Sequence, residues 1–85
     1  KRIIQMIYKL ILETGGETYK TKGKTLLEAV EKIPLTWKDV KYKGNLKIAK
    51  GKKSFERLFY PRQLRMLFAN KILRARITNS IERIL

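Results

Sequence analysis

Apolar and polar residues alternate along the first part of the chain. From position 4 to position 12 every even residue is apolar, whereas the odd positions mix isoleucine with Gln5 and Lys9. A period of two in residues that favour β-structure predicts a strand with one buried face. Gly15 and Gly16 follow and allow a reversal. We therefore expect a β-hairpin whose returning strand covers residues 18–22.

The pattern changes from strand to helix after Gly23. Thr25 and Glu28 have the spacing of a capping box. In this motif the Thr25 side chain accepts a hydrogen bond from a backbone N–H near residue 28, and the Glu28 side chain reaches back to the start of the helix. Pro34 ends the helix, because the residue before a proline disfavours the α conformation. An apolar stripe along this short helix comprises Leu26, Leu27, Val30 and Ile33. We expect residues 35–39 to be a connection that Trp37 anchors in the core.

A second alternating segment covers residues 40–48. Its apolar positions are Val40, Tyr42, Leu46 and Ile48, and the positions between them include Lys41, Lys43 and Lys47. This pattern predicts a strand with one lysine-bearing face. A tight turn at residues 50–52 then leads to a partner strand over residues 54–59, which completes a second hairpin.

The carboxy-terminal segment reads as a helix with Pro61 in its first turn, continuing toward Leu85. One apolar side carries Leu64, Phe68 and Ala75, and another carries Met66, Leu73, Ile77, Ile81 and Ile84. A helix that is apolar on more than one side is normally buried on more than one side. One small sheet covers only one of them. Either the helix breaks near Asn70 and folds back, or its distal half packs on another subunit or partner.

These elements predict an α+β fold in a single domain, residues 1–85. The order is ββα-ββα, with residues 1–37 as the first unit and residues 38–85 as the second, which ends in an extended helix. We expect an antiparallel sheet of about four strands with a short helix and a long C-terminal helix on one face. The length of 85 residues suits one domain, and a hydrophobic content of 44% argues against disorder.

The charge balance is strongly positive. Twenty-one Lys and Arg face seven Asp and Glu, which gives a net charge of +14, and the chain contains no His and no Cys. Such a surplus favours a polyanionic partner. The lack of His and Cys removes the side chains that serve most general-base and nucleophilic schemes. We therefore expect a non-enzymatic protein with no cofactor and no metal.

One short motif resembles a phosphate-binding loop but fails on spacing. Gly23-Lys24-Thr25 lies between a strand and a helix, yet Thr18 stands where the loop requires its first glycine. The strand before it is also expected to be one arm of an antiparallel hairpin. Only a general attraction of the helix amino terminus for anions remains.

The basic residues form two candidate sites for nucleic-acid phosphates. One is the second hairpin, with Lys41, Lys43, Lys47, Lys50, Lys52 and Lys53. The other is a stripe on an unbroken C-terminal helix, where Arg62, Arg65, Arg76 and Arg83 fall within about 60° at 100° per residue. Both predict binding of DNA or RNA without sequence preference. The lysines also suit a hairpin edge kept soluble by charge, and the arginines also suit the solvated face that any amphipathic helix needs.

Two other functions remain open. The chain is alternatively a structural subunit of a virion or ribonucleoprotein, docking through Met66, Leu73, Ile77, Ile81 and Ile84 as a protein-partner or homo-oligomer interface. A basic inhibitor of an acidic protein has the same charge features. We expect a cytoplasmic protein, or one inside such a particle, because a chain without Cys fits a cytosolic setting. We also expect no integral membrane span, because no apolar run approaches about 20 residues.

Overall fold

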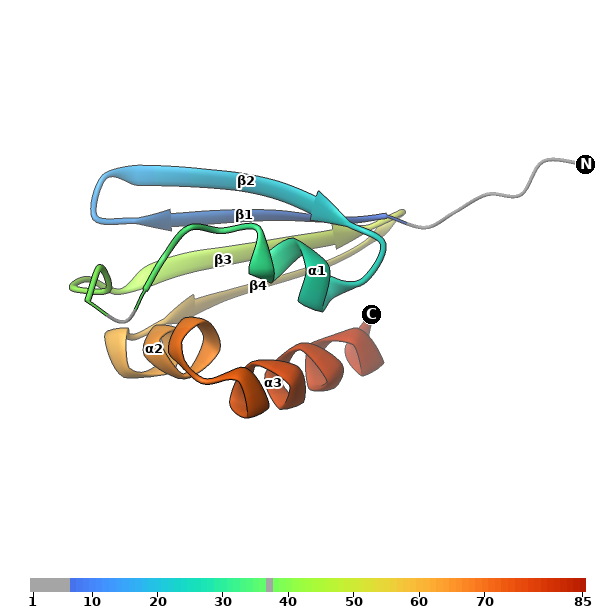
Figure 1. Cartoon of the computed structure of the whole chain (residues 1–85). Coiled ribbons are helices and arrows are strands. Elements are labelled where there is room, and N and C mark those ends of the chain that lie inside the picture. The colour runs from blue at the N-terminus through green and yellow to red at the C-terminus, as the bar shows by residue number, and fades with distance from the viewer. Residues whose placement is uncertain (1–6, 37) are drawn as a thin grey trace, which may run out of the picture.

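Two β-hairpins lie side by side and form one antiparallel sheet. The computed structural model describes residues 7–36 and 38–85. In chain order the elements are β1 (Tyr8–Thr14), β2 (Glu17–Gly23), α1 (Leu26–Glu31), β3 (Gly44–Lys50), β4 (Lys53–Phe59), α2 (Pro61–Ala69) and α3 (Lys71–Ile84). The strand order across the sheet is β2-β1-β3-β4, so the first strands of the two hairpins pair in the centre (Figure 1).

Glycines set both hairpin turns. Gly15 and Gly16 both have positive φ, at 56° and 82°, whereas in the second turn Gly51 alone does, at 61°. These are the backbone signs of type I′ and type II′ turns, whose twist matches that of the flanking strands. Both predicted hairpins are confirmed.

The core lies between the sheet and its helices, which cover the same sheet face (Figure 1). Alternate residues of the two central strands face it and are buried: Tyr8, Leu10 and Leu12 from β1, and Leu46 and Ile48 from β3. Helix α1 lies close to the end of β2, where a Cβ on Gly23 would stand 2.8 Å from the backbone nitrogen of Ala29. The predicted α+β fold with ββα-ββα order is confirmed.

The cap of α1 matches only half of the predicted capping box. The Thr25 hydroxyl accepts a hydrogen bond from the backbone N–H of Glu28 at 3.1 Å. The Glu28 carboxylate does not reach back. It instead pairs with Lys32 one turn later, at 3.5 Å. This pair is exposed and of the i,i+4 type, so it stabilises the helix by only a few tenths of a kcal/mol.

The second hairpin begins later than its alternating pattern predicts, because β3 starts at Gly44 and residues 40–43 lie outside the sheet. The reason is the neighbouring strand. β1 ends at Thr14, whose hydroxyl donates toward the carbonyls of Tyr42 and Lys43 at 3.3 and 3.2 Å. Beyond Thr14 the chain turns away and offers no further partner. Tyr42, predicted to face the core, is 61% exposed.

The C-terminal helical segment breaks at Asn70, as one of the two sequence alternatives predicted. Asn70 adopts an extended conformation, and its side-chain oxygen accepts from the N–H groups of Ile72 and Leu73, both at 3.0 Å. Arg74 closes the end of α2: its Nε donates to the Leu67 carbonyl at 2.9 Å and its Nη2 to the Phe68 carbonyl at 2.8 Å. These contacts satisfy carbonyls that lack partners within the helix.

Asp39 organises the connection that leads to β3. Its carboxylate accepts from both the backbone N–H and the hydroxyl of Thr36, each at 2.9 Å. These two bonds, together with nearby Lys41, hold the pKa of Asp39 below its ordinary value of 3.8. Hydrogen bonds to the charged form favour that form.

We predict that this turn loses its stabilisation in acid. Because the folded pKa is depressed, the contribution is complete above pH 3.8 and disappears as the pH falls through the lower folded value. An NMR titration of the Asp39 carboxyl and the Thr36 amide should show both signals changing together below pH 3.8. In Asp39→Asn the Thr36 amide signal should not titrate. A Thr36 amide signal that titrates equally in both proteins would contradict this assignment.

Two sequence expectations fall outside the described residues, namely the start of the first strand at residues 4–6 and the anchoring of Trp37. Within residues 7–36 and 38–85, no helix has both the length and the apolar character needed to cross a bilayer.

Candidate nucleic-acid interface

The sheet face opposite the helices carries four lysines. Lys9 comes from β1, Lys20 and Lys22 from β2, and Lys47 from β3. In each strand these lysines alternate with residues that face the core. Because successive side chains of a strand point to opposite faces of the sheet, the lysine side chains lie on the face away from the helices. All four are exposed. We call these residues the lysine face.

Strand register brings the four lysines together around Ile11. Lys9 stands directly opposite Lys22, and Ile11 stands between Lys20 on β2 and Lys47 on β3. Directly opposed residues in antiparallel strands have Cα atoms about 4.5–5.5 Å apart. The Cα atoms of Lys20 and Lys47 are therefore about 10 Å apart across β1. Ile11 is half-buried among them.

No ion pair neutralises this cluster within the described chain. The two ion pairs there join Lys32 to Glu28 and Arg74 to Glu31. Glu56 lies opposite Lys47 in the register, but its carboxylate accepts a hydrogen bond from the Asn45 side chain at 2.9 Å.

The positive charges of the lysine face repel one another. Like charges directly opposite on paired strands destabilise a sheet, as Lys9 and Lys22 do here. A bound anion would relieve that repulsion.

Two shallow hollows flank Ile11 on this face, each of about 300 Å³. Lys9 and Ile11 line both. Lys20 and Lys22 complete the first, and Lys47 and Glu56 belong to the second. The surface thus combines a small apolar centre with ammonium groups around it. Ammonium groups around an apolar centre can hold an anion that also has an apolar part.

The six lysines predicted to share the second hairpin do not share one surface. Lys41 and Lys43 lie in the connection before β3, and Lys52 lies in the turn at the opposite end of the hairpin. Lys50 and Lys53 face each other on the helix side of the sheet. The Lys50 ammonium lies 5.2 Å from the centre of the Tyr8 ring. Lys47 alone among the six belongs to the lysine face, so the predicted lysine-faced hairpin is wrong as a geometric unit.

The predicted arginine stripe does not form, because it required an unbroken helix. Arg62 and Arg65 lie on α2, and Arg76 and Arg83 lie on α3 after the break at Asn70. Arg65 donates to the Val40 carbonyl at 3.1 Å and so holds the connection before β3.

The predicted partner interface is divided between the core and the surface. Ile81 is buried and belongs to the core, and Ile77 packs against that core. Met66 and Leu73 are half-buried, and Ile84 is 67% exposed. The break at Asn70 lets α3 turn this side toward its own sheet, so Ile81 packs into the core of its own chain instead of standing exposed on a free helix face.

Sequence reasoning missed Lys9, Lys20 and Lys22 as site residues. A signal for the latter two was present, because residues 18–22 alternate and the two-glycine turn fixes which residues oppose Lys9 and Ile11. No local signal could have placed Lys47 beside them, since that depends on β1 pairing with β3.

Comparison of the chain with family models, curated proteins and solved structures found no match. Within the part of the chain that the structure describes, no three carboxylates gather as a metal site would require.

Proposed function

We propose that this protein binds nucleic acid through the lysine face, by contacts to phosphates and without sequence preference. The observation that carries the proposal is the grouping of four exposed lysines around Ile11, on a sheet face that none of the three described helices covers. Lysine ammonium groups act as point charges toward phosphates. The net charge of +14 adds long-range attraction for the same partner.

The chemistry of this face favours backbone contacts over reading of base edges. Planar side chains such as those of Arg and Asn are pre-organised to make paired hydrogen bonds to a base edge, whereas a lysine ammonium is a point charge on a flexible stem. The four cations around Ile11 are all lysines, and Asn45 is engaged by Glu56. Phosphate contacts position a protein on nucleic acid but carry no sequence information.

The test is the salt dependence of binding to fluorescent DNA duplexes and single strands, measured by anisotropy. Four phosphate contacts give a logarithmic slope of about −3.6 on duplex, so affinity should fall about a hundredfold between 50 and 200 mM salt. Duplexes of unrelated sequence should bind within about threefold of one another, because contacts to phosphate do not discriminate among bases.

Binding that is indifferent to salt, or no binding at low salt, would overturn the proposal. A rapid independent check is the 260/280 nm absorbance ratio of protein purified without a high-salt wash. Co-purified nucleic acid should raise this ratio, and a high-salt wash should return it to the value of the protein alone.

A further inference from the structure

Among residues 7–36 and 38–85, no strand pairs with the outer edge of β4. This strand is the last in the order β2-β1-β3-β4, and Lys50 and Lys53 flank its two-residue turn as a facing pair. In such a hairpin the flanking pair exchanges both hydrogen bonds, so residues 53, 55, 57 and 59 direct their backbone groups toward β3. Residues 54, 56 and 58 direct theirs outward. Within the described chain, no backbone hydrogen bond from another segment reaches those groups.

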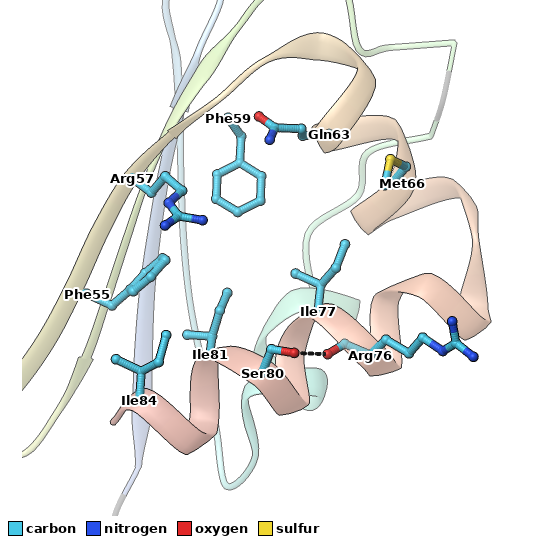
Figure 2. Close-up of a pocket in the computed structure, with 10 residues that line it drawn as sticks. All are labelled: Phe55, Arg57, Phe59, Gln63, Met66, Arg76, Ile77, Ser80, Ile81 and Ile84. Carbon is cyan, nitrogen blue, oxygen red and sulfur yellow. Dashed lines mark hydrogen bonds between the residues drawn. The ribbon is translucent and has the colours of Figure 1, made fainter.

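An apolar groove of about 320 Å³ lies beside the same strand (Figure 2). Phe55 and Phe59 of β4 form one side, and Ile77, Ile81 and Ile84 of α3 form the other. Ile84 remains 67% exposed. A strand added to the outer edge of β4 would direct every second side chain into this groove, because side chains alternate between the two faces of a sheet.

The charge of the groove selects among possible occupants. Its lining includes Arg57 and Arg76 and no carboxylate. The Arg57 guanidinium lies 5.7 Å from the centre of the Phe55 ring, and Figure 2 shows it between Phe55 and Phe59. Arg76 borders the groove, with its side chain extending along α3 away from β4. A second copy of the chain would bring a further net charge of +14 to this edge and would be repelled. A carboxylate on an added strand would instead be attracted to Arg57, which lies near the middle of β4.

We propose that β4 and this groove bind an extended acidic segment of a partner protein, which adds to the sheet as a fifth, antiparallel strand. Backbone groups of residues 54, 56 and 58 hold the segment, as in other cases of strand addition. Its alternate side chains are apolar opposite Phe59, acidic opposite Arg57 and apolar opposite Phe55. These are the non-hydrogen-bonded positions, where facing side chains lie closest.

The test uses a fluorescein-labelled peptide with valine, threonine, glutamate, threonine and valine at its centre. In the proposed register the two threonines direct their N–H groups toward β4, and the valines and glutamate direct theirs away. N-methylation of both threonines should weaken binding about tenfold or more, because two backbone hydrogen bonds are lost. N-methylation of the two valines should leave the dissociation constant within about threefold. Equal losses for both peptides, or no binding of the parent peptide, would overturn strand addition.

Charge reversal tests the position of the carboxylate. Arg57→Glu should weaken binding of the glutamate peptide about tenfold, because a pair of opposite charges becomes a pair of like charges. The same variant should strengthen binding of a peptide with lysine in place of glutamate, because there a pair of like charges becomes a pair of opposite charges. Arg83→Glu is the matched control, since Arg83 is exposed on α3 and does not line the groove. If both variants change the affinities equally, the attraction is only that of net charge and the proposed site is wrong.

Two further measurements separate this site from its alternatives. Replacing the four lysines of the lysine face by glutamine should leave peptide binding within about threefold of the parent, because those side chains lie on the opposite sheet face. Sedimentation of the free protein should show a monomer. A dimer that the peptide dissociates would assign β4 to a second copy of the chain and overturn the proposed occupant.

Discussion

Replacing Lys9, Lys20, Lys22 and Lys47 together by glutamine is expected to weaken binding to a DNA duplex at least about a hundredfold at 50 mM salt. The logarithmic salt slope should become shallower by about 3 to 4, since each lost phosphate contact removes about 0.9. Glutamine keeps the length and polarity of these exposed side chains and removes only their charge. Anisotropy titrations over a series of salt concentrations measure both quantities.

A second quadruple variant provides a control of equal charge. Lys41, Lys43, Lys52 and Lys53 are also exposed, and they lie in the connection before β3, in the hairpin turn and on the helix side of β4. Their replacement by glutamine lowers the net charge by the same amount but leaves the lysine face intact. It should reduce affinity much less. Equal losses in the two variants would show that net charge alone governs binding, and a larger loss in the control would place the site elsewhere.

Thermal unfolding distinguishes lost contacts from lost folding. The four lysines of the lysine face make no ion pair within the described chain, and Lys9 and Lys22 oppose each other. Removing these charges should therefore leave the unfolding midpoint unchanged or raise it slightly. A marked fall in the midpoint would mean that the variant lost affinity by unfolding.

Arg74→Leu is expected to lower the free energy of unfolding by about 2–4 kcal/mol, because hydrogen bonds from charged groups contribute more than neutral ones. The side chain is 17% exposed and donates to the carbonyls of both Leu67 and Phe68. Leucine would leave these carbonyls at the end of α2 without a side-chain partner. The Arg74–Glu31 ion pair, at 3.4 Å, adds little, because the Glu31 side chain is 44% exposed.

Arg76→Leu is the matched control for this effect. Arg76 is exposed and donates no side-chain hydrogen bond within the described chain. Its replacement by leucine should change stability by at most about 0.5 kcal/mol. The stability of Arg74→Lys should lie between those of Arg74→Leu and Arg76→Leu, because an ammonium group lacks the planar fork that reaches two carbonyls. Urea unfolding curves for the three variants measure these differences, and equal stability of Arg74→Leu and Arg76→Leu would contradict the capping role of Arg74.

Features with local causes were accessible from the sequence. The paired glycines at Gly15 and Gly16 specified one hairpin turn, and Thr25 specified the start of α1. Asn70 marked the position where the helix could break, because its side chain caps the N–H groups that follow it. The alternation within β1 and β2 also separated core-facing residues from exposed ones. Each of these features depends on residues that are close along the chain.

The candidate site depended on contacts between distant segments. Pairing of β1 with β3 brings Lys47 beside Lys9 and Ile11, and no periodicity within either strand encodes that pairing. The last pair between β1 and β3 joins Thr14 to Gly44, so β3 begins at Gly44. Lys41 and Lys43 therefore lie outside the strand that the alternating pattern of residues 40–48 predicted. The break at Asn70 divided the arginines between two helices and turned Ile81 into the core.

The sequence by itself determined the elements, their turns and a surplus of positive charge. Only the tertiary structure decided which cations share a surface, because the neighbours of a strand are set by which hydrophobic faces bury one another. The lysine face and the outer edge of β4 both follow from the strand order β2-β1-β3-β4. That order places β1 and β3 in the centre, where alternate residues of both strands are almost fully buried.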